Sequence, residues 1–265
     1  MKEIIEHLTL LNFSVDGGVA IVKMNNPPVN ALTPGFLDEF KTVLDHITAE
    51  QKIRALLLTS QVSGFFSAGD DISQLQDFDK EILEELPRVH QLMNRIEALP
   101  IPTIAAVNGH ALGGGLELAL TCDFRFMAAN SGYLGLPEVR LGMIPAFGGT
   151  QRLPLFVGRT KAIEMMYEGS KLSSEQAKDI GLINDVYEVD VFSDSCTNYA
   201  RRLSFQATAA IARIKRCVLA GQYEGAVKGL EMERIGCEEC FDGVDAREGV
   251  TAFLSGKKPN FEGIS

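Results

Sequence analysis

The sequence predicts an α/β fold in which a largely parallel sheet is followed by a helical C-terminal region. Short β-rich runs alternate with helical patterns through residues 1–190. Strand patterns fade from residue 148 onward, whereas helical spacing continues to residue 240. The 265 residues, 46% of them hydrophobic, suffice for one sizeable core with a helical appendage.

The first elements should be a hairpin and a helix. Residues 8–15 and 19–24 are β-rich, and Asp16-Gly17-Gly18 between them tolerates positive φ, so we expect a hairpin. Thr33 and Pro34 have the N-cap and first-turn pattern of a helix. The apolar residues that follow at helical spacing are Phe36, Leu37, Phe40, Val43, Leu44 and Ile47.

Buried strands and helices then alternate. Short apolar runs at residues 55–58, 103–107 and 124–127 are typical of buried strands, and residues 82–99 and 116–120 between them are typical of helices. This order implies βαβ units.

Only helices are expected toward the C-terminus. Ser173 and Gln176 have capping-box spacing at a helix start. Helical patterns follow over residues 191–203, 208–219 and 223–240.

Composition excludes several functional classes. The net charge of −10 disfavours nucleic-acid binding. No apolar run approaches the ~20 residues that span a bilayer, and residues 1–11 lack signal- and transit-peptide features. The five cysteines and four histidines have no disulfide-framework or metal-ligand spacing, so we expect a soluble cytoplasmic protein without a metal site.

Three stretches carry chemistry, and the first is residues 66–72, after a buried strand. Its small residues, including Ser67, Ala68 and Gly69, let the backbone approach a ligand closely. The alternative is a strand-to-helix turn with Asp70 or Asp71 as the N-cap.

The second stretch is Gly113-Gly114-Gly115, followed by Glu117. Glycines at a helix start expose backbone N–H groups, and the helix dipole adds partial positive charge, which suits developing negative charge. The alternative is a flexible turn with a solvated Glu117.

The third stretch is residues 135–153, where Glu138 stands among apolar neighbours. Apolar surroundings disfavour the ionised carboxylate, which suits proton transfer. The alternative is an ion pair with Arg140 or Arg152.

Together with residues 25–32, 158–182 and 245–259, these stretches resemble the crotonase (enoyl-CoA hydratase/isomerase) superfamily over nearly the whole chain. The resemblance implies a spiral of ββα turns, with the active site in residues 1–190. It implies that residues 191–265 form a lid and the contacts of a trimer or a dimer of trimers.

The resemblance also implies an enoyl-CoA hydratase, a lyase of fatty acid metabolism in which Glu117 and Glu138 transfer protons. The backbone N–H groups of Ala68 and Gly114 would form the oxyanion hole. Coenzyme A would be part of the substrate, with no separate cofactor and no nucleic-acid or membrane partner. The residues expected to bind substrate are Ser67, Gly69, Asp70, Ile72, Gly113, Pro137, Phe147, Lys257 and Lys258.

Two alternatives remain open: a Δ3,Δ2-enoyl-CoA isomerase or other acyl-CoA enolate enzyme, and a non-catalytic acyl-CoA-binding scaffold. Both glutamates favour the hydratase, because isomerases of the superfamily often keep only one. The chain departs from the family pattern by one extra residue near residues 129–132, where Gly132 favours an outward loop.

Overall fold

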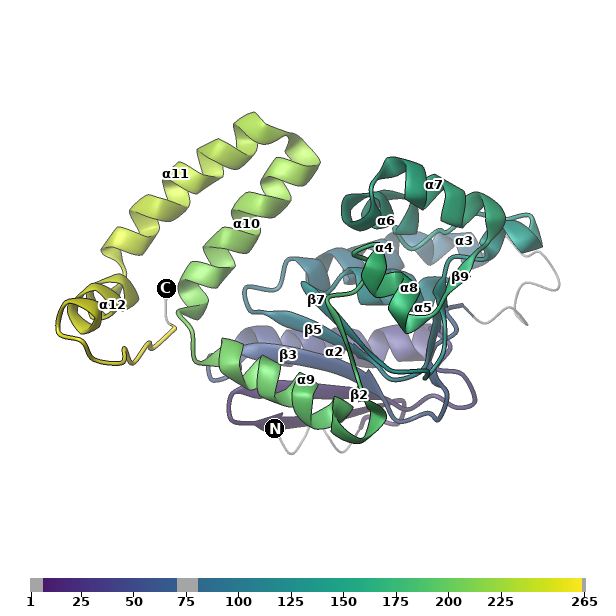
Figure 1. Ribbon diagram of the computed structural model, residues 1–265, viewed down its shortest axis with the longest axis horizontal. Coiled ribbons are helices and arrows are strands. Elements are labelled where there is room, and N and C mark those ends of the chain that lie inside the picture. Colours follow the sequence, from purple (N-terminus) through teal and green to yellow (C-terminus); the bar gives the residue numbers. More distant parts are fainter. Residues whose placement is uncertain (1–6, 71–80, 264–265) are drawn as a thin grey trace.

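The computed structural model describes residues 7–70 and 81–263 and contains a large, mainly parallel sheet (Figure 1). Only the first two strands run antiparallel, as the predicted hairpin, and the expected α/β fold is confirmed. The half-buried edge strand β10 was not predicted, because three residues give too short a pattern. The strands in order across the sheet are β1 (Leu11–Asp16), β2 (Val19–Met24), β3 (Ala55–Ser60), β5 (Thr103–Val107), β7 (Phe124–Ala128) and β10 (Asp185–Tyr187).

A second sheet is built from strands of two or three residues, none of which the sequence predicted. Each of its first three strands directly follows a strand of the large sheet, and a helix comes after the pair. This repeat is the expected ββα spiral. The strands in order are β4 (Phe65–Ser67), β6 (His110–Leu112), β8 (Leu134–Gly135) and β9 (Lys171–Leu172).

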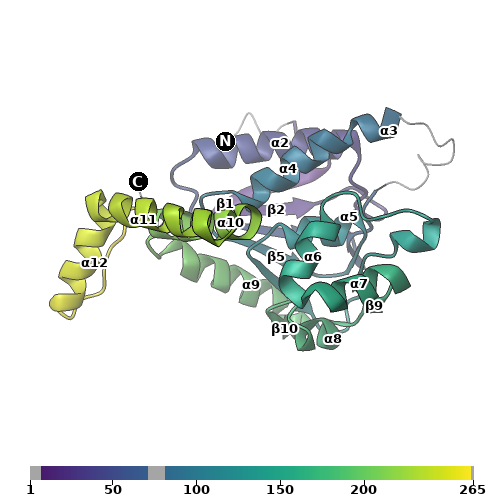
Figure 2. The ribbon, with the colours of Figure 1, turned by 90° about the horizontal axis from the view of Figure 1, so that it is seen from above.

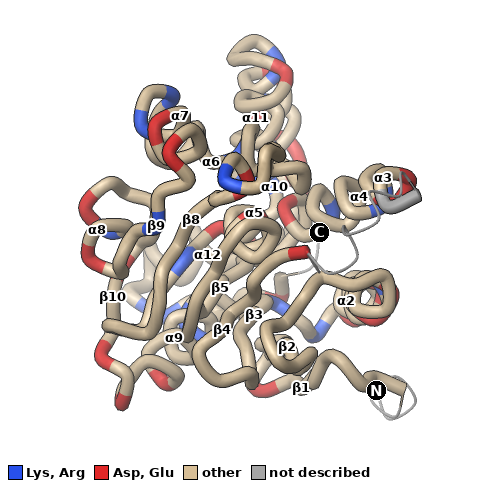
Figure 3. Tube along the Cα trace, turned by 90° about the vertical axis from the view of Figure 1, so that its right-hand side faces the viewer, with Lys and Arg blue, Asp and Glu red and all other residues tan. Residues whose placement is uncertain are grey.

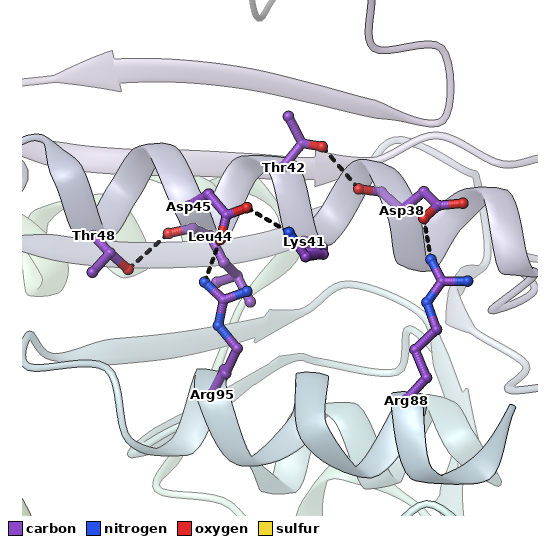
Figure 4. Close-up of polar contacts among 8 residues, drawn as sticks. All are labelled: Asp38, Lys41, Thr42, Leu44, Asp45, Thr48, Arg88 and Arg95. Atoms are coloured by element: carbon purple, nitrogen blue, oxygen red, sulfur yellow. Dashed lines mark hydrogen bonds and ion pairs between the residues drawn. The ribbon is translucent and has the colours of Figure 1, made fainter.

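The helix α2 (Pro34–Ala49) begins as predicted, with the Thr33 hydroxyl accepting the Phe36 N–H. Its six buried residues are the six apolar residues expected at helical spacing. Two ion pairs join it to α4 (Leu86–Glu97): Asp38 with Arg88, and Asp45 with Arg95 at 2.6 Å (Figure 4).

The helix predicted over residues 82–99 is divided into α3 (Glu81–Glu84) and α4, which corrects that prediction. Pro87 explains the break. It has no N–H to donate to the carbonyl of Leu83, and its ring clashes with that carbonyl in a continuous helix.

The large sheet is covered on both faces. On one face, Phe192, Cys196 and Ala200 of α9 (Val189–Ser204) pack against the strands. On the other face, the main core lies between the sheet, α2, α4 and α5 (Gly114–Leu120). The division of the chain at residue 190 stays a prediction.

Three further helices, α10 (Thr208–Glu224), α11 (Ala226–Asp242) and α12 (Val244–Leu254), project away from the sheets (Figures 1 and 2). The break between α10 and α11 falls at Gly225, with φ +95°, rather than between residues 219 and 223 as predicted. The two helices cross closely, because Gly221 and Gly229 face each other without side chains.

The remaining helices are α6 (Gly149–Val157), α7 (Arg159–Glu168) and α8 (Ser174–Asp179), with the short 3₁₀ helix η2 (Glu138–Leu141). The capping box at Ser173 and Gln176 is confirmed. Charged residues of both signs lie on outer helices such as α7 and α11 (Figure 3). All five cysteines are free, and none of the helices within the described ranges is long and apolar enough to cross a membrane.

Candidate active site

Glu117 lies on α5, a helix whose residues are all buried. Its side chain is 1% exposed, and one carboxylate oxygen, Oε1, accepts two backbone hydrogen bonds. The donors are the N–H of Phe147 at 2.8 Å and the N–H of Gly149 at 2.6 Å. A flexible turn with a solvated glutamate is therefore excluded.

Burial raises the pKa of Glu117 from 4.5 to about 7. The N–H groups of Gly149 and Phe147 and the charge of Arg152 act in the opposite direction, while the charge of Glu138 raises the pKa further. A carboxyl group with a pKa near neutral pH suits proton transfer.

Glu138 begins η2 and lines the same cavity as Glu117. Its Oε2 atom is buried and has no hydrogen-bond partner in the part of the chain that the structure describes. Burial raises the pKa of Glu138 as well. The alternative ion pairs are not formed, because Arg140 reaches the carbonyl of Glu168 and Arg152 pairs with Glu97.

The segment from Ser67 to Asp70 is held in place by Asn30, a buried residue with φ +53°. The Asn30 amide donates to the carbonyl of Phe66 at 2.9 Å, and the hydroxyl of Ser67 donates to the carbonyl of Asn30 at 2.7 Å. Sequence reasoning assigned no role to Asn30, although it lies in the family-like stretch at residues 25–32.

The fold brings this segment against the glycine run. A Cβ added to Gly69 would lie 2.6 Å from the backbone nitrogen of Gly114, and one added to Gly115 would lie 2.1 Å from the carbonyl oxygen of Ser67. Because Gly114 is the first residue of α5, its N–H has no acceptor within the helix. The two stretches predicted to hold an oxyanion thus meet at one place.

One predicted donor is corrected. Ala68 lines the cavity, but its N–H donates to the carbonyl of Val29 at 2.9 Å, so this amide is engaged within the protein. The next N–H, of Gly69, donates to the Ser67 hydroxyl at 3.1 Å. Sequence reasoning missed these bonds because they depend on the loop conformation.

A cavity of about 190 Å³ joins these groups. Ser67 and Gly69 adjoin the lining residues Ala68 and Asp70 but are not themselves among the described lining residues. Lys257 and Lys258, which follow α12, are not among them either. Ile72 lies outside the described residues. The predicted residues that line the cavity are Ala68, Asp70, Gly113, Gly114, Glu117, Pro137, Glu138 and Phe147. Further lining residues are Leu37 of α2, Leu86 and Val89 of α4, and Leu141, Met143 and Ile144 from the third stretch.

The turn at residues 129–132, where the chain has one extra residue, keeps Asn130 exposed and Gly132 half-buried. Asn130 adopts φ +55°, and a Cβ added to Gly132 would lie 2.6 Å from the His110 nitrogen. The absence of a side chain at Gly132 lets the turn contact the backbone at His110, and the outward loop at residues 129–132 stays a prediction.

The close approach at Gly69 predicts a large effect of Gly69→Ala on folding. The residue has φ +88°, and the new methyl group would meet backbone. Gly64→Ala is the matched control, since Gly64 has φ +76° with open space around it. We expect Gly64→Ala to cost about 1–2 kcal/mol of unfolding free energy and Gly69→Ala clearly more in urea unfolding. Equal costs would contradict the close packing.

Burial of Glu117 predicts that stability depends on pH. The folded state binds the proton more tightly than the unfolded state, so this contribution is complete below pH 4.5 and is lost as the pH rises through about 7. Relative to Glu117→Gln, the parent protein should therefore lose up to about 3 kcal/mol of unfolding free energy between pH 5 and 8. Urea unfolding of both proteins measures this, and a pH-independent difference would contradict it.

Comparisons with known proteins fit this geometry. The family model described as enoyl-CoA hydratase/isomerase matches residues 14–264. A probable enoyl-CoA hydratase of Bacillus subtilis is 40% identical, covering 97% of this chain and all of the relative. An enoyl-CoA isomerase/hydratase of Mycosarcoma maydis is 39% identical over 75% of this chain and 73% of its own. The crystal structure of an enoyl-CoA hydratase from Geobacillus kaustophilus superimposes with a TM-score of 0.93 at 33% identity, covering 97% and 98% of the two chains.

Proposed function

Because the chain belongs to the enoyl-CoA hydratase/isomerase (crotonase) family, we propose that it adds water across the 2,3 double bond of an acyl-CoA thioester. One observation carries the proposal: two carboxyl groups with raised pKa, Glu117 and Glu138, line one largely apolar cavity. Hydration needs such a pair, because one group takes a proton from water while another gives a proton to carbon. Coenzyme A is part of this substrate, and no separate cofactor is required.

The carbonyl oxygen of the thioester must accept negative charge when water attacks C3. We place the Gly114 N–H, at the start of α5, against this oxygen. We assign the second donor to the backbone N–H of Asp70, because this residue lines the cavity beside Gly113 and Gly114.

The two glutamates then have different tasks. Backbone donors fix Oε1 of Glu117, so its carboxylate is oriented to take a proton from water. The oxygen of that water forms the new bond to C3. Glu138, whose pKa is raised by burial, delivers a proton to C2 of the enolate. Proton exchange with solvent then restores both groups.

The cavity favours an uncharged, apolar acyl group. Its charged lining residues within the described ranges are all acidic, namely Asp70, Glu85, Glu117 and Glu138. The remaining lining is mainly aliphatic, with Phe147 near the glutamates. An acyl group that carries a free carboxylate at its far end would meet the negative charges of these lining residues and no described cation.

A panel of enoyl-CoA thioesters tests the function through loss of the conjugated absorbance. We expect straight-chain 2-enoyl-CoA to be hydrated and a carboxylated 2-enoyl-CoA to react poorly. The name of the Mycosarcoma maydis relative also makes isomerisation a candidate, and conversion of 3-enoyl-CoA to the conjugated isomer would reveal it. Acyl-CoA binding without either reaction would support a non-catalytic scaffold.

We also propose a trimer or a dimer of trimers assembled through the projecting helices. Large apolar side chains are exposed there, and burying them would favour association. Lys257 and Lys258 remain candidates for binding the CoA phosphates. The most exposed of these apolar residues are Val227, Phe241, Phe253 and Leu254.

A further inference from the structure

Arg152 lies behind the cavity, on α6, with 4% of its surface exposed. Its guanidinium group donates to the carbonyl oxygen of Phe147 at 3.3 Å and to the side-chain oxygen of Asn94 at 2.7 Å. Two of its nitrogens also donate to Oε2 of Glu97, at 2.9 and 3.2 Å. A buried cation with this many fixed partners defines the position of the backbone that it contacts.

That backbone is the segment from Phe147 to Gly149, which holds the carboxylate of Glu117. The N–H groups at the two ends of the segment both donate to Oε1 of Glu117. Between them, Gly148 has φ +107°, and a Cβ added there would lie 2.2 Å from Nη1 of Arg152. The segment is thus enclosed between the guanidinium on one side and Glu117 on the other.

A residue from the projecting helices completes the arrangement. The hydroxyl of Tyr223, on α10, donates to Oε1 of Glu97 at 2.8 Å, so both oxygens of this carboxylate are bonded. A continuous series of hydrogen bonds therefore runs from α10 through Glu97 and Arg152 to the segment that contacts Glu117.

We propose that Arg152, itself fixed by Glu97 and Tyr223, is a positioning residue that keeps the Phe147 and Gly149 amides directed at Glu117. The proposal rests on the proposed function only in assigning Glu117 to proton transfer. Without the guanidinium, the carbonyl of Phe147 and the bend at Gly148 lose their support. The carboxylate then loses donors and orientation, and a displacement of about 1 Å can reduce a rate by about 10²-fold.

The charges around Glu117 support this reading. Glu138 faces it from η2 and Asp70 lines the same cavity, whereas Arg152 is the cation that lowers the pKa of Glu117. Glu97 balances the charge of Arg152 from α4. Loss of the guanidinium should therefore raise the pKa of Glu117 further.

Arg152→Lys tests the proposal, because lysine keeps the charge but cannot bond Phe147 and Glu97 at once in a planar fork. We expect kcat for hydration to fall by on the order of 10²-fold with little change in KM. In ¹³C NMR of protein labelled at the glutamate carboxyl carbons, the pKa of Glu117 should rise by about one unit. The NMR titration needs no turnover, so it separates failure of this proposal from failure of the proposed function.

Further variants keep the test decisive. The double variant Arg152→Met/Glu97→Met removes both buried charges and should raise the Glu117 pKa more than Arg152→Lys does. Tyr223→Phe removes one hydroxyl and no charge, and should raise the pKa of Glu117 by a smaller amount. This variant tests the proposal if Arg152→Lys does not fold. Asp45→Asn is the matched control, because it breaks an ion pair between Asp45 of α2 and Arg95, a neighbour of Glu97 on α4 (Figure 4). It should leave both kcat and the pKa of Glu117 unchanged.

An unchanged Glu117 pKa and unchanged kcat in folded Arg152→Lys and Tyr223→Phe, with only a lower melting temperature, would overturn the proposal. That result would assign Arg152 to stability alone. A shift of the same size in Asp45→Asn would overturn it as well.

Discussion

Glu117→Gln is expected to lose at least about 10³-fold in kcat for hydration of 2-enoyl-CoA while still binding the thioester. Glutamine has nearly the shape of glutamate, and its carbonyl oxygen can accept the Phe147 and Gly149 N–H groups that now bond Oε1. The amide cannot take a proton from water. The fold and the cavity should therefore persist while the chemistry stops.

Loss of the conjugated absorbance measures this turnover, and calorimetry with a saturated acyl-CoA measures binding. Glu164→Gln is a suitable control, because Glu164 is half-exposed on α7 and pairs only with Lys161 among the described residues. Turnover of Glu117→Gln within a few fold of the parent protein would remove Glu117 from the mechanism.

Glu138→Gln should lose hydration to a comparable extent, about 10²–10⁴-fold, for a different reason. Glu138 presents a buried oxygen without a hydrogen-bond partner in the described structure, and burial raises its pKa. These features suit a carboxylic acid that gives its proton to carbon. The amide has no such proton to give.

Hydrogen exchange distinguishes the two glutamates. In D₂O, a saturated acyl-CoA should exchange its C2 protons through Glu138, so Glu138→Gln should abolish exchange and Glu117→Gln should retain most of it. Mass spectrometry of the recovered thioester measures the deuterium. The reverse pattern would exchange the two roles that we propose.

How much of the fold was predictable depended on element length. The six buried residues of α2 recur at helical spacing over several turns, so their pattern was unambiguous. The strands β8 and β9 have two residues each and give no period. Helices α6 and α7 begin after glycines without a capping side chain, so the usual start signal was absent.

The candidate site, like the fold, was predictable only in part. By itself, the sequence determined the candidate groups, because Glu117 and Glu138 stand in apolar stretches beside glycines and such neighbours can be read directly from the sequence. Only the tertiary structure decided what each group contacts: that Val29 engages the Ala68 amide, and that Arg152 pairs with Glu97 rather than with Glu138. Hydrogen bonds act over about 3 Å between atoms that the fold brings together from distant parts of the chain, and spacing along a sequence does not specify them.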